Sequence, residues 1–178
     1  MSCIPATPTT GVYLSDTSAL YKSLGTISTS ALSQYYPLET APSVLTFSQV
    51  AKSTYQHLRI AQVQIRETAS SSANIKKTAL QVLLFTDAAP TAPTAGAVYN
   101  PATTNMLGIV EIATADYKRW SDTVWVASVN TNLFVRTGAL ATATNIYAVV
   151  LANETKTYAA SAIVEVSLIT ECHNEVAI

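Results

Sequence analysis

Most of this chain consists of short apolar runs separated by small polar clusters, and this pattern constrains the fold more than any other feature. From residue 44 onward, the runs are rich in β-branched, aromatic and leucine residues, which is typical of strands bounded by turns. No helical segment bridges any two of these runs, which argues against a parallel βαβ architecture. We expect strands at residues 45–50, 55–66, 78–86, 106–112, 124–129, 133–137, 145–152 and 162–170.

About eight strands joined by turn-forming clusters predict an all-β fold, an antiparallel β-sandwich with a jelly-roll-like arrangement. Two hairpins are expected, one joining 133–137 to 145–151 and one joining 145–151 to 162–168. A short helical turn is expected at 114–120, where Thr114 can cap the first turn and the basic residues fall in the last.

The first part of the chain differs from the rest because it is rich in Ser, Thr and Pro. Its prolines prevent a long helix. It is either a flexible leader or an arm that becomes ordered against a neighbour, and its aromatic residues favour the arm because disordered leaders contain few of them. We therefore divide the chain into an N-terminal arm (1–43), a β-sandwich domain (44–172) and a C-terminal tail (173–178).

Several predicted strands are apolar on both sides, whereas a sheet with one solvated face alternates apolar and polar residues. Residues 162–168 nearly alternate, but 80–85 and 146–151 do not. Between Ile60 and Val63 the apolar positions change parity, which predicts a β-bulge. Because a two-layer sandwich has one core, strands that are apolar on both faces need a second cover. That cover could be the N-terminal arm, another subunit or a larger assembly surface.

Charged residues make up only 12% of the chain, against about 25% in a typical soluble protein. The formal net charge of -1 gives none of the positive field that nucleic-acid binding needs. The longest apolar run, 146–152, is far shorter than the roughly 20 residues that cross a bilayer, so we expect no membrane span. A surface so poor in charge favours contacts with other molecules, although a lone threonine-rich β protein is the alternative.

The sequence offers little for catalysis or metal binding. The N-terminus lacks the basic and apolar segments of a secretory signal, so we expect a cytoplasmic origin in which Cys3 and Cys172 stay reduced, with a disulfide between them left open. Two Cys and two His, with His57 far from His173 in the chain, are a poor basis for a zinc site. Neither a nucleophile elbow nor a phosphate-binding glycine loop is present. We expect no enzymatic activity, no catalytic residue, no cofactor and no metal.

The aromatic residues are the better candidates for function, because large rigid aromatics dominate the energetics of protein interfaces. Trp120 has charged and polar neighbours in sequence, whereas Trp125 could equally belong to the core. Lys118 and Arg119 could cap the helical turn or bind the carboxylates of a partner. The predicted interface residues are Tyr13, Leu14, Tyr35, Tyr36, Tyr99, Met106, Lys118, Arg119, Trp120 and Trp125.

Three stretches in order carry a resemblance to a known group of proteins: 83–87 leading into the loop rich in Pro, Thr and Ala at 87–105, then 105–112, then 144–150 before a closing strand. In this order, residues 55–170 resemble the small β-sandwich head auxiliary proteins of tailed bacteriophages, also called cement or capsid decoration proteins. The resemblance implies a virion structural protein on the capsid exterior, present in the host cytoplasm during assembly. It also implies that the protein binds between subunits of the major capsid protein, stabilises the head and forms a homo-oligomer, either a dimer or a trimer.

Two other functions remain open at this point. The same fold could serve as a tail, neck or baseplate subunit, or as a carbohydrate-binding module with a groove lined by Trp120, Trp125 and Tyr99. If residues 1–43 form an arm, their removal is expected to weaken attachment without unfolding the sandwich.

Overall fold

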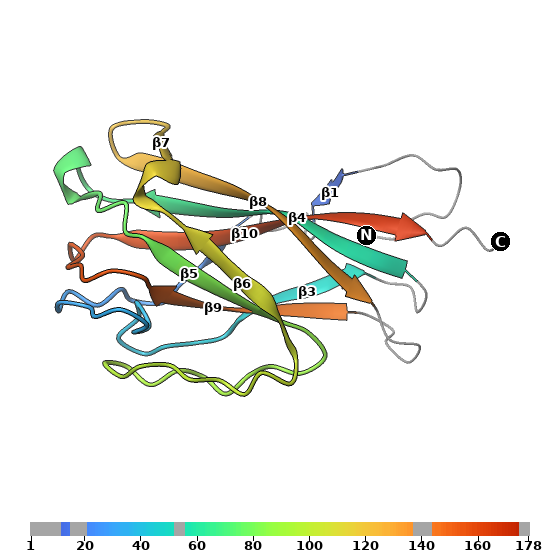
Figure 1. Ribbon diagram of the computed structural model, residues 1–178. Coiled ribbons are helices and arrows are strands. Elements are labelled where there is room, and N and C mark those ends of the chain that lie inside the picture. The colour runs from blue at the N-terminus through green and yellow to red at the C-terminus, as the bar shows by residue number, and fades with distance from the viewer. Residues whose placement is uncertain (1–11, 15–20, 52–55, 137–143, 175–178) are drawn as a thin grey trace.

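The strands of this protein form two antiparallel sheets that pack face to face (Figure 1). The computed structural model describes residues 12–14, 21–51, 56–136 and 144–174. Within these residues, a six-stranded sheet has the order β1-β10-β4-β8-β7, with β2 also paired to β10, and a four-stranded sheet has the order β3-β9-β5-β6. The predicted all-β antiparallel sandwich is confirmed.

The strands and the two short 3-10 turns have the following bounds: β1 (Val12–Leu14), β2 (Lys22–Ser23), β3 (Leu45–Ala51), β4 (Gln56–Thr68), η1 (Ser72–Asn74), β5 (Leu80–Phe85), β6 (Met106–Ile112), η2 (Thr114–Asp116), β7 (Tyr117–Arg119), β8 (Val124–Arg136), β9 (Thr144–Ala152) and β10 (Ile163–Asn174). The expected helical turn at 114–120 is therefore a 3-10 turn followed by a strand. β10 also extends past the predicted end of the sandwich, and residues 175–178 lie outside the described part.

The positions of the strands were easier to predict than their pairing. The two strands expected at 124–129 and 133–137 form one strand, β8. Both expected hairpins are wrong, because β8 and β10 lie in the six-stranded sheet and β9 lies between them in sequence but in the other sheet. The chain passes from one sheet to the other at both connections, so these strands share no ladder of hydrogen bonds. Within the described residues, the consecutive strands that pair are β5 with β6 and β7 with β8.

The predicted bulge in β4 is confirmed. The register of β4 shifts between Ile60 and Gln62 against both of its neighbours, β8 and β10. The shift changes the parity of the strand, so that Ile60, Val63 and Ile65 all lie in the core and are fully buried. One extra residue thus keeps a long strand apolar on its inner face throughout.

Residues 21–43 belong to the sandwich and do not form a separate arm. Leu24, Ile27, Leu32 and Leu38 are buried in the main core with the inward residues of both sheets. The backbone joins too, since the Leu32 amide donates to the carbonyl of Lys156 (2.8 Å). Removal of 1–43 would strip these side chains from the core, which corrects the expectation that the sandwich survives the truncation.

The buried Glu39 fixes the path of this segment. Its carboxylate accepts hydrogen bonds from the amide of Gly25 (2.6 Å) and from the amide and hydroxyl of Ser43 (3.1 and 3.0 Å). A side chain at Gly25 would bring its Cβ within 2.9 Å of the Glu39 Oε1, so glycine is needed at this close approach. One carboxylate therefore ties together both ends of a segment that has almost no regular secondary structure.

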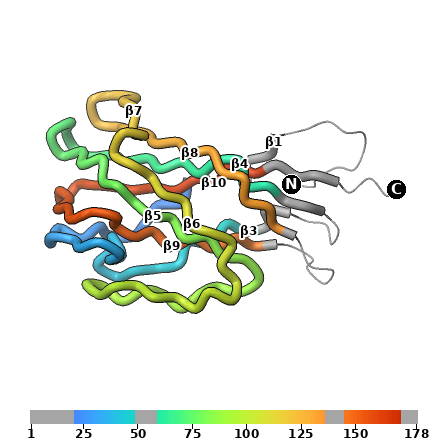
Figure 2. Tube along the Cα trace, viewed as in Figure 1, coloured from blue at the N-terminus to red at the C-terminus, as the bar shows by residue number. Residues whose placement is uncertain are grey.

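The second apolar face of the four-stranded sheet is covered by the chain itself. Leu83 and Phe85 of β5 and Val149 and Leu151 of β9 point away from the main core and are nevertheless buried. The partly buried side chains that pack over them are Val44, Tyr99, Met106 and Tyr147. Figure 2 shows the loop between β5 and β6 folded back along one side of the molecule. The sequence left open the N-terminal arm, another subunit or a larger assembly surface as the cover, and the structure shows a fourth, which is the loop between β5 and β6 with its neighbours.

Candidate interaction surface

Trp120 stands at the tip of the β7–β8 hairpin and is 79% exposed, the largest exposure of any big hydrophobic residue in the described part of the chain. The hairpin holds it firmly, because the amides of Trp120 and Ser121 both donate to the carbonyl of Val124 (3.0 and 3.1 Å). An indole ring presented to solvent from a fixed backbone loses little entropy on binding, which suits an interface anchor.

The charges around Trp120 are held by neighbouring groups of the same hairpin. Arg119 forms an ion pair with Asp122, three residues on. The Lys118 ammonium donates to the carbonyl of Ala115 in η2, just before the hairpin (3.2 Å). Both basic side chains remain exposed. The hairpin tip therefore presents one large apolar ring beside two cations, one of which is balanced by a carboxylate.

Trp125 lies on the same hairpin but has a different environment. Its ring is partly buried and packs against the main core. The Lys77 ammonium lies over the ring, 4.6 Å from its centroid, in cation–π geometry. Of the two readings that the sequence left open for Trp125, the structure supports the core residue.

Tyr99 and Met106 cover the outer face of their own sheet. The Tyr99 hydroxyl donates to the carbonyl of Thr91 (2.6 Å), and its amide donates to the carbonyl of Tyr35 (3.1 Å). Partial burial raises the pKa of the Tyr99 hydroxyl. Both residues were predicted as interface residues, and in the structure both pack against the apolar outer face of their own sheet.

The remaining predicted interface residues lie near the N-terminus. Tyr35, at 40% exposure, is partly available, and Tyr36 is half-buried. Tyr35 has a positive φ of 66° and its amide donates to the carbonyl of Ala152 (2.7 Å), so it lies against β9. Tyr13 and Leu14 are in β1, which pairs with β10 at the edge of the six-stranded sheet, and their side chains are outside the described part.

Other exposed apolar residues were missed by the sequence reasoning. They are Val98 in the long loop, Ile109 in β6, Phe134 in β8 and Ile163 in β10. Phe134 is flanked by Leu133 and Val135, so the sequence predicts that it belongs to a continuous buried run. Only the parity of β8 could have shown it, because the buried Val135 places Phe134 on the opposite face.

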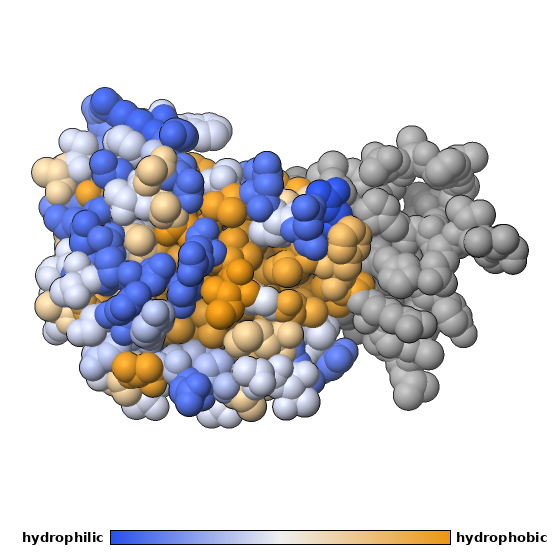
Figure 3. All heavy atoms as spheres, viewed as in Figure 1, coloured by the Kyte–Doolittle hydropathy of each residue, from blue (hydrophilic) through white to orange (hydrophobic). Residues whose placement is uncertain are grey.

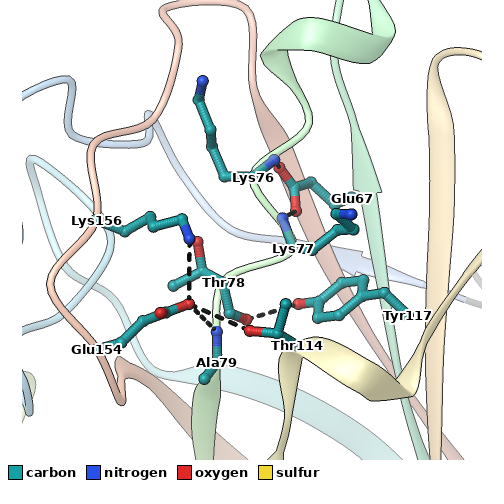
Figure 4. A network of polar contacts seen from close by, with 9 residues as sticks. All are labelled: Glu67, Lys76, Lys77, Thr78, Ala79, Thr114, Tyr117, Glu154 and Lys156. Atoms are coloured by element: carbon teal, nitrogen blue, oxygen red, sulfur yellow. Dashed lines mark hydrogen bonds and ion pairs between the residues drawn. The ribbon is translucent and has the colours of Figure 1, made fainter.

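A cluster of polar groups lies around the segment that leads into β5 (Figure 4). The fully buried Glu67 accepts hydrogen bonds from the amides of Lys76 and Lys77 (2.6 and 2.8 Å), and burial raises the pKa of its carboxyl. Beside it, the Tyr117 hydroxyl donates to the carbonyl of Thr78 (3.1 Å), and burial raises its pKa well above the ordinary value.

The geometry of this cluster favours a structural role. Glu67 receives its hydrogen bonds from the backbone where Lys77 has a positive φ of 50°, so the carboxylate stabilises an unfavourable turn. Nearby, Glu154 accepts from the amide of Ala79 (2.7 Å) and lies 3.6 Å from the Lys156 ammonium. Both carboxylates thus hold the chain segment that leads into β5.

The described residues contain no group of three or more His, Cys, Asp or Glu that could hold a metal ion. Within the same residues, no helix is long and apolar enough to span a membrane.

No protein-family model matches this sequence, and no curated protein matches it. A search of solved structures gives a chain from the native virion of Kashmir bee virus at acidic pH. It is 15% identical, with 79% of this chain and 72% of that chain covered, and the TM-score is 0.17. A likeness this low carries no argument about fold or function.

Proposed function

We propose that this protein is a non-enzymatic structural component of a virion that attaches to an ordered protein surface. The observation that carries the proposal is Trp120, an almost fully exposed indole on a hairpin whose backbone is fixed. Large aromatic anchors of this kind supply most of the energy of many protein interfaces. An exposed tryptophan with no such partner would only cost solubility.

The character of the remaining surface supports the same proposal. Only 12% of the chain is charged, so few strongly hydrated groups must be stripped of water when the protein is packed against a neighbour. Glu67 and Glu154 accept hydrogen bonds from backbone amides of their own chain, which supports a structural role for both.

The resemblance to phage head decoration proteins supplies the finer part of the proposal. On that basis the partner is the major capsid protein, the place is the exterior of the head, and the role is to stabilise the shell. A tail, neck or baseplate position would use the same anchor. The carbohydrate-binding alternative loses its support, because Trp120, Trp125 and Tyr99 lie in three different environments and form no common groove.

The test is the binding of purified protein to phage heads that lack it, followed by sedimentation and electron microscopy. Trp120→Ala is expected to weaken binding by about 30-fold, which corresponds to roughly 2 kcal/mol for a central anchor. Its thermal unfolding should be unchanged, because the ring contributes little to the core.

Phe134→Ala is the matched control, because Phe134 is also a large exposed aromatic residue. Unlike Trp120, it lies on the outer face of the sheet in β8, away from the hairpin tip. Equal binding by Trp120→Ala and the unmodified chain would overturn the proposed anchor. Density at the tail or baseplate, and none on the head, would reject the decoration role and keep the structural one.

A further inference from the structure

The four edges of the two sheets differ in how well they are protected. On one side the six-stranded sheet ends in the three-residue β1 and the two-residue β2. On the other side the three-residue β7 covers only Trp125–Ala127 of β8, and the rest of β8 is an edge that lies beside β6. On the four-stranded sheet, β3 loses its register with β9 between Phe47 and Ala51. Short or irregular edge strands are the usual way in which proteins avoid pairing with other chains.

β6 is the regular edge strand of the four-stranded sheet. It has seven residues, and within the described part of the chain it pairs only with β5. The register shifts once, between Leu84 and Phe85 of β5, which leaves Gly108–Ile112 as a regular stretch. β6 contains no Lys, Arg or Pro to discourage pairing, and its one charged residue is Glu111.

The side chains along this edge are apolar as well. Ile109 lies beside Leu83 on the outer face of the sheet and is 50% exposed. Leu107 and, on the nearby β8, Leu133 pack against the main core but are only partly buried. Figure 3 shows hydrophobic residues gathered along β6 and the adjoining part of β8. This edge thus combines an unpaired backbone with an apolar surface.

The inner side of β6 is already occupied. Gly108 lies so close to β8 that a Cβ there would come within 2.9 Å of the Leu133 Cδ2. β6 is therefore fixed from within by β8 and from one side by β5, and a further strand can add only at its open edge.

We infer that two copies of this protein associate through β6, pairing antiparallel about a two-fold axis near Ile109. A second copy fits this edge because it offers an equally unpaired edge of the same length and apolar character. In this register the two Ile109 side chains meet and become buried. The two Glu111 carboxylates lie four positions apart, about 13 Å, which is beyond the screening length at physiological salt. The formal net charge of -1 adds little repulsion between copies.

The first experiment measures the mass of the full chain in solution by sedimentation equilibrium. The unmodified protein is expected at twice 18.9 kDa, and Ile109→Lys at the mass of one chain, because a charged side chain at the centre of an edge blocks pairing. The matched control is Ile163→Lys, since Ile163 has a similar exposure (48%) but lies on β10. It should remain a dimer.

A second experiment tests the register. Ile109→Cys, in a chain that also carries Cys3→Ser and Cys172→Ser, is expected to form a disulfide-linked dimer on mild oxidation. A monomeric unmodified chain at high concentration would overturn the inference, as would an Ile109→Lys variant that folds by circular dichroism and stays dimeric. Absence of the cross-link in a dimer would place the contact elsewhere. None of these measurements involves phage particles, so their failure would leave the proposed attachment role standing.

Discussion

The outer faces of the two sheets meet the surroundings in opposite ways. On the four-stranded sheet this face is apolar, and the loop between β5 and β6, together with Val44 and Tyr147, covers it. On the six-stranded sheet the outer face carries amide and charged side chains, among them Gln62, Gln64 and Arg66. One face is apolar and buried by chain folded over it, and the other is polar and partly exposed.

The polar face is held together by hydrogen bonds between side chains along β4 and from β4 to its neighbours. Gln62 donates to Asn130 (3.1 Å), and Gln64 donates to Gln62 (2.7 Å). Tyr21 donates through its hydroxyl to Gln64 (2.9 Å), while its ring lies 4.3 Å from the guanidinium carbon of Arg66. Such partly exposed pairs add little individually, so this face should tolerate substitution far better than the covered one.

The largest difference between the faces is expected from two phenylalanines. Phe85 is 1% exposed under the loop on the four-stranded sheet, and Phe134 is 65% exposed on the six-stranded sheet. Phe85→Ala should lower the free energy of unfolding by about 3–5 kcal/mol, because it leaves a cavity. Phe134→Ala should change it by less than about 0.5 kcal/mol. Urea denaturation measures both.

A similar loss from the two variants would contradict this account of the apolar face. If Phe85→Ala were nearly neutral, the loop would not cover the sheet in solution, and the face would be free to contact another molecule. The pair of variants therefore decides whether the second cover comes from within the chain.

The sequence predicts the strands well because alternation and β-branched runs report directly on which positions are buried. Residues 106–112 were predicted as a strand and form β6, and the parity change after Ile60 located the bulge. β8 was split in two because Asn130 and Asn132 look like a turn. In the structure these amides bind Gln62 and Arg59 on the solvated face, where polar residues are normal in a strand.

What covers a buried position could not be predicted in the same way. The pattern at 80–85 correctly requires burial on both faces, but it does not say whether a loop or a neighbour provides the cover. Tyr99 lies in a loop with no alternating pattern of apolar residues. Nothing in the neighbouring sequence therefore predicts that it packs against the cluster that contains Phe85. The exposure of Trp120 was easier to predict, because charged and polar neighbours in sequence leave an aromatic ring little to pack against.

Substitution of a polar residue on the inner face is expected to change the free energy of unfolding by an intermediate amount. Glu67 follows Val63 and Ile65 with the same parity and is fully buried beneath η1 and the turn at Lys76 and Lys77. Glu67→Gln should lower the free energy of unfolding by about 1–3 kcal/mol, because the glutamine side chain can accept only one of the two backbone hydrogen bonds well.

The pH dependence of this loss of unfolding free energy tests whether burial raises the pKa of Glu67. Because burial favours the neutral carboxyl, the stabilisation is complete below the unfolded pKa of about 4.5 and declines as the pH rises through the folded pKa. The difference in unfolding free energy between the unmodified chain and Glu67→Gln should therefore shrink from pH 4 toward pH 7. A difference that grows with pH would show that the two amides outweigh the effect of burial.

The smallest effect is expected from the ion pair on the polar face. Arg66 pairs with Glu165, which also accepts a hydrogen bond from the Ser23 hydroxyl (3.1 Å). A double-mutant cycle with Arg66→Gln and Glu165→Gln should give a coupling below about 1 kcal/mol, because the arginine side chain is more than a third exposed. Added salt should reduce the coupling further, since screening acts strongly on exposed charges. A coupling above about 2 kcal/mol that salt leaves unchanged would mean that this pair is shielded from solvent. The outer face of the six-stranded sheet would then also need a cover, and the contrast between the two faces would disappear.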